Sequence, residues 1–326
     1  MRSSANSRMP PLASRRVFLQ RSVQTALGVA GGAWLSRLPA GAIEPFQRPG
    51  APRLLLSLAG YSFRDYMKDS THKRDKQADP AKQIDLFQFV DYCADHGCTG
   101  TELTSYYFPK ELTTDYLIRL RRHAFLRGVA VSGTAVGNNF AQPKGARRDQ
   151  EIADVKQWID RAAILGAPHI RVFAGSPDGI SKEEALELCT AALQECSDYA
   201  GTRGIMLGLE NHGGIVSEPA DLLKIIRGVK SPWLGVNLDT GNYFTEDPYG
   251  DMTQLAPYAV NVQIKPEIGR RRDGRVQKEP ADLPRVVKII RDANYQGYLA
   301  LEYESAEDPW TAVPRLLKQL AGLFAA

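Results

Sequence analysis

The chain has 326 residues, of which 43% are hydrophobic and 24% are charged, enough for one large α/β domain with a substantial core. Its formal net charge at pH 7 is +4. Six of the 41 basic residues and none of the 37 acidic ones lie in residues 1–42, so residues 43–326 hold 35 basic and 37 acidic residues, a formal charge of −2. This balance lacks the concentrated basic footprint of nucleic-acid-binding proteins, and we expect no nucleic-acid partner.

The first 42 residues predict an export leader. Ser14–Gln20 contains paired arginines and resembles the twin-arginine signature. A mildly apolar, glycine- and alanine-rich run over 23–35 and a small-residue site at 40–42 follow it. We therefore expect a leader at 1–42, recognition by the twin-arginine export machinery, a periplasmic location and no membrane span once the leader is removed. A basic amphipathic N-terminus on a cytoplasmic protein is the alternative.

A strand-like apolar run followed by a helix-like segment recurs eight times after the leader, at intervals of roughly thirty residues. Ser181 followed by Glu184 predicts a capping box at the start of one helix, and Gly166 predicts the end of another. The predicted strands are 54–58, 99–103, 129–132, 169–173, 205–209, 234–238, 259–262 and 298–301. The predicted helices are 80–96, 113–126, 149–165, 181–200, 219–229, 250–258, 281–293 and 310–324.

Eight such units, with neither a second composition nor a linker between them, predict a single (β/α)8 TIM barrel over residues 43–326. A doubly wound open sheet is the alternative, but the chain lacks the glycine fingerprint of that fold after its first strand. The four cysteines do not have metal-ligand spacing, and buried free thiols are favoured over disulfides. They are Cys93, Cys98, Cys189 and Cys196.

Oxygen-bearing side chains end the last four predicted strands. They are Glu210, Asp239, Gln263 and Glu302. Because active sites of such barrels form at the carboxyl ends of the strands, we expect these side chains to lie close together. Three neighbouring carboxylates need a compensating cation, and ligands that are all oxygen favour one hard divalent ion, Mn²⁺ or Mg²⁺, over Zn²⁺. The alternative is that each side chain separately caps a turn or pairs with a lysine or an arginine.

The four strand ends read Leu-Glu-Asn-His, Leu-Asp-Thr-Gly-Asn, Val-Gln-Ile-Lys and Leu-Glu-Tyr-Glu. In this order they resemble the xylose isomerase-like TIM-barrel superfamily of sugar isomerases and epimerases, over essentially the whole of residues 43–326. In the ketose 3-epimerases and their relatives, Glu, Asp, His and Glu from the last four strands hold one metal. The resemblance implies Glu210, Asp239 and Glu302 as ligands, with Gln263 where many members have His.

The resemblance implies a metal-dependent isomerase or epimerase that acts on a keto sugar. A proton next to a carbonyl group becomes removable when a cation stabilises the enediolate oxygen and a carboxylate acts as base. Glu210 and Glu302 are the predicted base and acid. A lyase or hydratase acting on a 3-keto-glycoside would begin with the same proton abstraction and stays open, as does a non-catalytic periplasmic sugar-binding barrel. A multi-zinc nuclease of the same superfamily is disfavoured by a total of five histidines.

Five further residues are candidates for substrate binding. Lys265 and Arg171 stand at strand ends and could hold a substrate oxygen or a developing negative charge; a salt bridge to a barrel carboxylate is the alternative. His212 would lie near the substrate or orient a ligand, and Asn242 stands where the family often has a substrate-contacting His. Glu102 ends the second predicted strand. The expected ligand is a free carbohydrate, and self-association into a homo-oligomer stays open.

Overall fold

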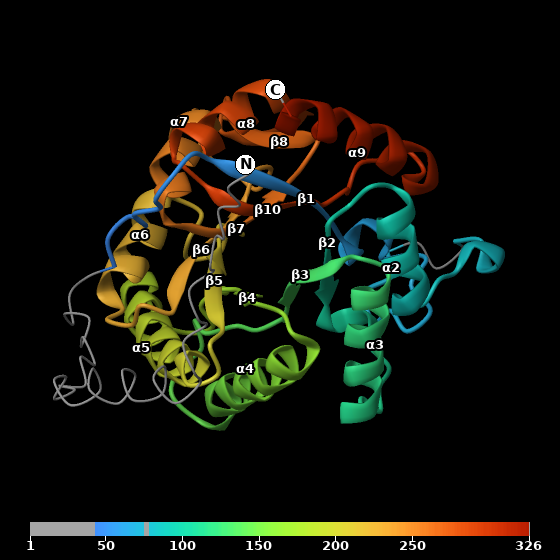
Figure 1. Ribbon diagram of the computed structural model, residues 1–326. Coiled ribbons are helices and arrows are strands. Elements are labelled where there is room, and N and C mark those ends of the chain that lie inside the picture. The colour runs from blue at the N-terminus through green and yellow to red at the C-terminus, as the bar shows by residue number, and fades with distance from the viewer. Residues whose placement is uncertain (1–42, 75–77, 326) are drawn as a thin grey trace, which may run out of the picture. The chain divides into compact units, whose positions relative to one another are not determined.

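The barrel strands of the computed structural model, which describes residues 43–74 and 78–325, close in the order β1-β10-β7-β6-β5-β4-β3-β2 (Figure 1). Every pairing in this ring is parallel. The predicted (β/α)8 TIM barrel is therefore confirmed. The strands are β1 (Arg53–Ala59), β2 (Gly100–Thr104), β3 (Ala130–Ala135), β4 (His169–Val172), β5 (Met206–Glu210), β6 (Leu234–Asp239), β7 (Ala259–Ile264) and β10 (Gln296–Leu301).

Eight α-helices of the described residues lie around the strands (Figure 1). Since helices cover the outside of the ring and side chains fill its inside, strands such as β2 and β6 are buried along their whole length. The helices are α2 (Leu86–Asp95), α3 (Thr114–Leu126), α4 (Ala146–Leu165), α5 (Lys182–Gly201), α6 (Pro219–Gly228), α7 (Pro248–Leu255), α8 (Leu283–Asp292) and α9 (Pro309–Ala325).

Local capping decides where several helices begin and end. The Ser181 side chain accepts a hydrogen bond from the backbone N–H of Glu184, and Gly166 ends α4 with φ at 83°, both as predicted. The predicted helix 80–96 starts later, because Asp85 and Gln88 form a reciprocal capping box at the start of α2. The residues before it form only a short 3-10 helix, Pro80–Lys82.

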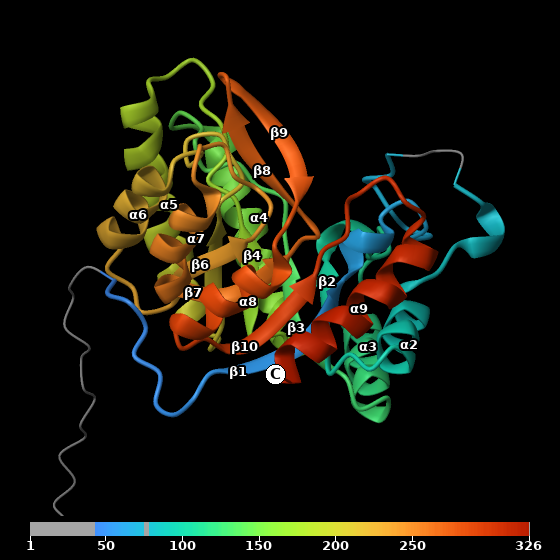
Figure 2. The same cartoon turned by 90° about the horizontal axis from the view of Figure 1, so that it is seen from above.

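A β-hairpin of β8 (Glu267–Arg272) and β9 (Arg275–Pro280) follows β7 and was not predicted from the sequence. Asp273 and Gly274 form its turn, both at positive φ. Figure 2 shows the hairpin projecting from the strands, beyond α7. Backbone hydrogen bonds tie β8 to the loop after β6, so the hairpin forms a fixed wall at the carboxyl ends of the strands.

All four cysteines are buried and free, as predicted. Burial raises the pKa of the Cys189 and Cys196 thiols, which disfavours the reactive thiolate. The predicted leader at residues 1–42 lies outside the described residues. Among the helices that the structure describes, none is both long and apolar enough to cross a membrane.

Candidate active site

The carboxyl ends of β5, β6, β7 and β10 bring the four predicted ligands side by side. Glu210 and Asp239 are the last residues of β5 and β6. Gln263 is the penultimate residue of β7, and Glu302 directly follows β10. These strands are neighbours in the ring, and all four side chains are at most 5% exposed. The strand-end geometry expected from the sequence is therefore present.

The ammonium group of Lys265 lies among the carboxylates. Its Nζ is 2.8 Å from Oδ2 of Asp239 and 3.1 Å from Oε2 of both Glu302 and Glu304. The residue is only 6% exposed. Burial opposes the charged form, but the carboxylates, Asp239 foremost, raise the pKa of Lys265 well above its ordinary value. The residue is therefore a permanent buried cation, and the salt-bridge alternative weighed for it from the sequence is what the structure shows.

Arg171, at the end of β4, supplies a second buried cation. Its Nε is 2.9 Å from Oε2 of Glu210, although the N–H is not aligned for a hydrogen bond. One terminal nitrogen donates to the carbonyl of Val136 at 3.0 Å, and the guanidinium carbon lies 3.9 Å from the ring centroid of Phe173. The guanidinium is thus held from three sides, with its charge directed at Glu210.

A closed ring of four hydrogen-bonded side chains lies inside the barrel beside this cluster. Glu102 accepts from Nε2 of Gln263 at 2.7 Å and from Nδ2 of Asn261 at 2.9 Å. Asn261 also donates to Oδ1 of Asn237 at 2.8 Å, and Asn237 donates to Oε1 of Gln263 at 2.7 Å. The Gln263 nitrogen also lies 3.3 Å from Oε1 of Glu302. The ring therefore fixes Gln263 with its amide nitrogen, and not its oxygen, toward the carboxylates.

Asp239 receives four donors from this chain. Backbone N–H groups of Gly241 and Asn242 donate to Oδ1 at 2.7 and 3.0 Å, and Nδ2 of Asn242 donates to Oδ2 at 2.7 Å. Lys265 is the fourth. The Asn242 amide also reaches Oε1 of Glu210 at 3.2 Å and so bridges the two carboxylates. A carboxylate has about four acceptor positions, and those of Asp239 are filled.

Asn211, the residue after Glu210, was overlooked in the sequence. Its side chain accepts from the backbone N–H of Asp239 and donates to that residue's carbonyl, both at 2.9 Å. It therefore fastens the end of β5 to the end of β6 and fixes where Asp239 points. Its place inside the Leu-Glu-Asn-His motif was the available signal.

His212 lies farther out than the carboxylates. Its side chain is exposed, and its ring centroid is 4.5 Å from that of Phe173. Both residues line a cavity of about 280 Å³ together with Asn138 and Asn139 from the loop after β3. The structure therefore places His212 at the wall of a cavity, beside the substrate-binding candidate Arg171 rather than among the predicted ligands.

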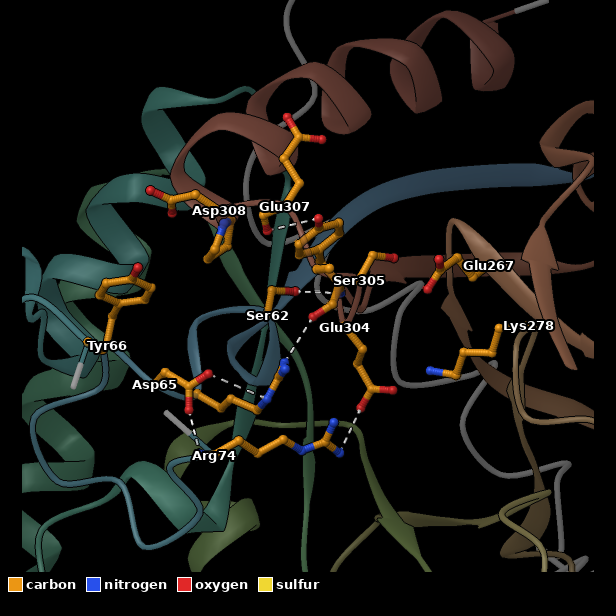
Figure 3. Close-up of a pocket in the computed structure, with 15 residues that line it drawn as sticks. Ser62, Asp65, Tyr66, Arg74, Glu267, Lys278, Glu304, Ser305, Glu307 and Asp308 are labelled. Carbon is orange, nitrogen blue, oxygen red and sulfur yellow. Dashed lines mark hydrogen bonds and ion pairs between the residues drawn. The ribbon is translucent and has the colours of Figure 1, made fainter. Parts of the chain in front are cut away.

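We call the end of the barrel at which the strands have their carboxyl ends the mouth. A larger cavity of about 670 Å³ adjoins Glu304 at this mouth (Figure 3). Arg74 points toward Glu304, with nitrogen and oxygen 3.8 Å apart. Lys278 and Glu267 come from the hairpin and line the same cavity. No sequence pattern pointed to these wall residues, because segments more than 190 residues apart supply them.

Two carboxyl groups of the cluster can retain protons near neutral pH. Burial raises the pKa of Glu302 to about 7, against the opposing attraction of Lys265. Burial likewise raises the pKa of Glu210 well above its ordinary value, with Arg171 opposing. A carboxyl group with a pKa near the working pH is suited to both giving and taking a proton, which is the behaviour of a general acid–base pair.

The predicted ligand set does not form a cage for Mn²⁺ or Mg²⁺ in this arrangement. Lys265 already binds Asp239 and Glu302, and Gln263 turns its nitrogen toward them. In the part of the chain that the structure describes, no three His, Cys, Asp or Glu side chains are grouped so as to hold a metal ion. The assignment of a divalent ion to Glu210, Asp239, Gln263 and Glu302 remains a prediction from the sequence.

Comparison with known protein families tests the family resemblance that the strand-end motifs suggested. The family model described as xylose isomerase-like TIM barrel matches residues 90–320. The chain belongs to this family. The resemblance stated from the motifs is thus confirmed at the level of this family of sugar isomerase- and epimerase-like barrels.

Individual members of the xylose isomerase-like family are only distantly similar to this chain. A 3-oxo-isoapionate decarboxylase of Pectobacterium atrosepticum is 26% identical over 197 residues, covering 59% of this chain and 65% of the relative, which is less than two thirds of its length. A structure of D-psicose 3-epimerase with D-tagatose, from Clostridium cellulolyticum H10, has a TM-score of 0.60 at 15% identity, covering 76% of this chain and 84% of the other.

A xylose isomerase-like TIM barrel protein of Mycobacterium smegmatis, solved in complex with magnesium, has a TM-score of 0.62 at 16% identity. The alignment covers 83% of this chain and 98% of that one. At such low identity the two structures support the fold. The magnesium complex shows that a divalent metal binds to a protein of this architecture, and it leaves open what the substitutions in this chain's own mouth do to such a site.

Proposed function

We propose that this barrel is a sugar isomerase or epimerase that moves a proton at the carbon next to the carbonyl group of a keto sugar. The observation that carries the proposal is the pairing at the mouth. Glu210 and Glu302 lie on either side of Asp239. Glu210 pairs with the buried cation Arg171, and Glu302 pairs with Lys265, which also contacts Asp239 and Glu304. Two carboxyl groups with separate charge partners can hold different protonation states, as an acid and a base must.

In the proposed reaction, the carboxylate of Glu210 takes the proton from the carbon next to the carbonyl group. The electron pair of that C–H bond forms the enediolate, and the negative charge moves to the carbonyl oxygen. The carboxyl group of Glu302 then returns a proton. In an epimerase the proton goes to the opposite face of the same carbon. In an isomerase it goes to the former carbonyl carbon, while the proton of the neighbouring hydroxyl passes to the former carbonyl oxygen and the neighbouring carbon becomes the new carbonyl. Because the predicted divalent ion does not fit the side-chain arrangement, no step is assigned to it.

The proposed substrate is a free keto saccharide. The two cavities of about 280 and 670 Å³ beside the mouth are lined by amide, hydroxyl and charged groups that suit sugar hydroxyls. The D-psicose 3-epimerase that the fold resembles was solved with a free ketose. The proposed periplasmic location through twin-arginine export points the same way, because phosphorylated sugars are scarce outside the cytoplasm. A reporter fused to residues 1–42 that fails to be exported by the twin-arginine route would contradict the proposed location.

A lyase or decarboxylase is the second candidate, and the similarity to 3-oxo-isoapionate decarboxylase favours it. Loss of CO₂ next to a carbonyl group leaves the same enediolate that proton removal does. The cationic groups at the mouth would serve either reaction. A decarboxylase breaks a carbon–carbon bond first, whereas an isomerase and a lyase that eliminates water both break a carbon–hydrogen bond first.

The test is hydrogen exchange into keto sugars in D₂O, followed by NMR. The purified protein is expected to place deuterium on the carbon next to the carbonyl group of at least one free ketose or 3-keto-glycoside. Glu210→Gln and Glu302→Gln should each slow exchange by about 10²- to 10⁴-fold, the usual contribution of a positioned acid or base. Glu183→Gln, on the exposed first turn of α5, is the matched control and should exchange like the parent.

Near-parental exchange in either mouth variant would contradict the two-carboxyl mechanism. Release of CO₂ or water from a substrate that shows no exchange would favour the second candidate.

A further inference from the structure

We propose that Lys265 takes the place of a divalent metal in this barrel, so that the chain's own ammonium group supplies the positive charge at the mouth. The catalytic part of this inference rests on the proposed function. Its central claim, that the carboxylates are occupied by a built-in cation and do not bind a divalent ion, stands on the geometry alone.

The position of the Lys265 ammonium is the position that a shared metal ion would need. Its Nζ lies 2.8 Å from Asp239 and 3.1 Å from Glu302. Mg²⁺ bound to oxygen sits at about 2.0–2.1 Å, so an ion bridging these same two oxygens would stand within contact distance of Nζ. A divalent ion and an ammonium group cannot share this space, because both the overlap and the like charges oppose it.

Gln263 strengthens this exclusion. Its oxygen is engaged by Asn237, and its nitrogen donates to Glu102 and faces Glu302. To become a ligand, the amide would have to turn over, which would leave the buried donors and acceptors of the ring without partners. Each buried group left without a partner destabilises the folded state. The fourth ligand position therefore presents the positive end of an N–H bond where a cation would bind.

Asp239 has no acceptor position left for a metal. Two backbone N–H groups, the amide of Asn242 and the ammonium of Lys265 fill both of its oxygens. These donors belong to the loop directly after β6 and to the end of β7, which Asn211 and the hairpin hold in place. A bound ion would have to displace groups that the fold itself positions.

Lys265 can also perform the electrostatic work of the proposed reaction. Its three N–H donors face Asp239, Glu302 and Glu304. Glu304 has a second cation, Arg74, at 3.8 Å and borders the larger cavity (Figure 3). A substrate carbonyl oxygen entering from that cavity can replace Glu304 at the ammonium. The charge that moves to the oxygen when Glu210 takes the proton is then met by a pre-positioned cation.

The experiment measures Mn²⁺ binding to the whole protein by calorimetry and by metal content after desalting. The parent protein is expected to bind no stoichiometric Mn²⁺, with a Kd weaker than about 1 mM, and treatment with EDTA should leave its proton exchange unchanged. Lys265→Met should tighten Mn²⁺ binding by at least about 10²-fold, since it removes a cation from among three carboxylates. Gln263→His combined with Lys265→Met should tighten it further.

Lys182→Met is the matched control, because Lys182 also forms a lysine–carboxylate pair, with Asp221 at 2.6 Å, between the first turns of α5 and α6. Its Mn²⁺ binding should equal that of the parent. Stoichiometric Mn²⁺ in the parent with a Kd below about 10 μM would overturn the proposal. So would a folded Lys265→Met variant, checked by circular dichroism, with no gain in affinity. The parent measurement needs no variant and decides the point even if Lys265→Met fails to fold.

Failure of this inference and failure of the proposed function give different results. Tight Mn²⁺ binding together with hydrogen exchange into a ketose would contradict the proposed role of Lys265 and support the proposed isomerase function. The opposite result is also possible: the parent binds no Mn²⁺, Lys265→Met gains Mn²⁺ affinity, and no keto sugar shows hydrogen exchange. It would support the proposal that Lys265 takes the metal's place and contradict the proposed isomerase function.

Discussion

Two buried polar regions lie next to each other inside this barrel. They differ in how far their hydrogen-bonding groups and charges are paired. In the ring of Glu102, Gln263, Asn237 and Asn261, each side chain is hydrogen-bonded to two others. In the neighbouring cluster around Lys265, carboxylates outnumber the cations that face them. Burial with complete pairing fixes geometry, whereas burial with surplus negative charge keeps protons available for transfer.

Gln263 links the two regions, since it belongs to the ring and its nitrogen also faces Glu302. The ring therefore acts as the support of the cluster. Damage to the ring should appear first as lost stability, and damage to the cluster as lost turnover. The following changes test that division, beginning with the largest expected effect.

Asn261→Asp should destabilise the fold by about 4 kcal/mol, because it places a second carboxylate against Oε2 of Glu102 with no cation between them. Urea unfolding followed by circular dichroism measures the change. Glu102→Gln combined with Asn261→Asp exchanges the amide and the carboxylate, and the double variant should recover about 2 kcal/mol of the loss. Additive losses in the double variant would show that the two side chains do not interact as the structure places them.

Stability should fall as the pH falls from 6.5 toward 4 because of His169, which is buried in β4. Burial lowers its pKa to about 4, and its Nε2 has no hydrogen-bond partner among the described residues. Between pH 4 and 6.5, the pKa values of His169 in the folded and the unfolded chain, the unfolded chain binds a proton that the folded chain does not. The stabilising contribution of neutral His169 is therefore fully present above pH 6.5 and is lost as the pH falls. The loss should reach about 3 kcal/mol.

Urea unfolding at several pH values measures the contribution of His169. His169→Gln should flatten this part of the profile of stability against pH. His72→Gln should flatten it much less, because His72 is exposed and its pKa is lowered less. An unchanged slope in His169→Gln would assign the effect to other groups.

Glu302→Gln should change the free energy of unfolding by less than about 1 kcal/mol, because a neutral amide replaces a carboxyl group whose ionisation burial already disfavours. The same variant is the one expected to lose proton exchange. Thermal and urea unfolding at pH 6, where the carboxyl group of Glu302 is mostly protonated, provide the measurement, with Glu183→Gln as control. A loss of several kcal/mol would mean that Glu302 is part of the supporting ring and not of the reactive cluster.

Arg74→Gln should have the smallest effect. Arg74 is more than half exposed, and its nitrogen is 3.8 Å from Glu304, so the pair contributes less than about 1 kcal/mol. We expect KM to change by less than about fivefold, with kcat unchanged, and this small effect should shrink as salt is added. A large fall in kcat would instead place Arg74 at the reacting atoms.

The sequence by itself determined the barrel and the end of it at which the four candidate side chains meet. Eight apolar runs alternating with amphipathic segments allow few other folds, and parallel strands of a closed barrel deliver their last residues to one end. Glu210, Asp239, Gln263 and Glu302 therefore meet where the motif order indicated. The barrel strands and helices were predicted and the hairpin of β8 and β9 was not, and element ends differed where a cap such as Asp85 outweighed the periodicity.

The tertiary structure decided what these residues do to one another. Asn237 and Asn261 look like ordinary residues of buried strands, and only closure of the barrel brings Asn261 to Glu102, 159 positions away in the chain. The hydrogen-bonded ring that this contact completes orients the Gln263 amide so that its nitrogen, and not its oxygen, faces the carboxylates. No sequence pattern encodes which end of an amide faces a neighbour. From the sequence alone, Lys265 could either bind a substrate oxygen or form a salt bridge to a barrel carboxylate.

The ammonium of Lys265 reaches its place because β6 and β10 flank β7, and so present carboxylates on both sides of its side chain. Which charges neutralise one another depends on distances of a few ångströms across the barrel. Those distances exist only once the strands have closed.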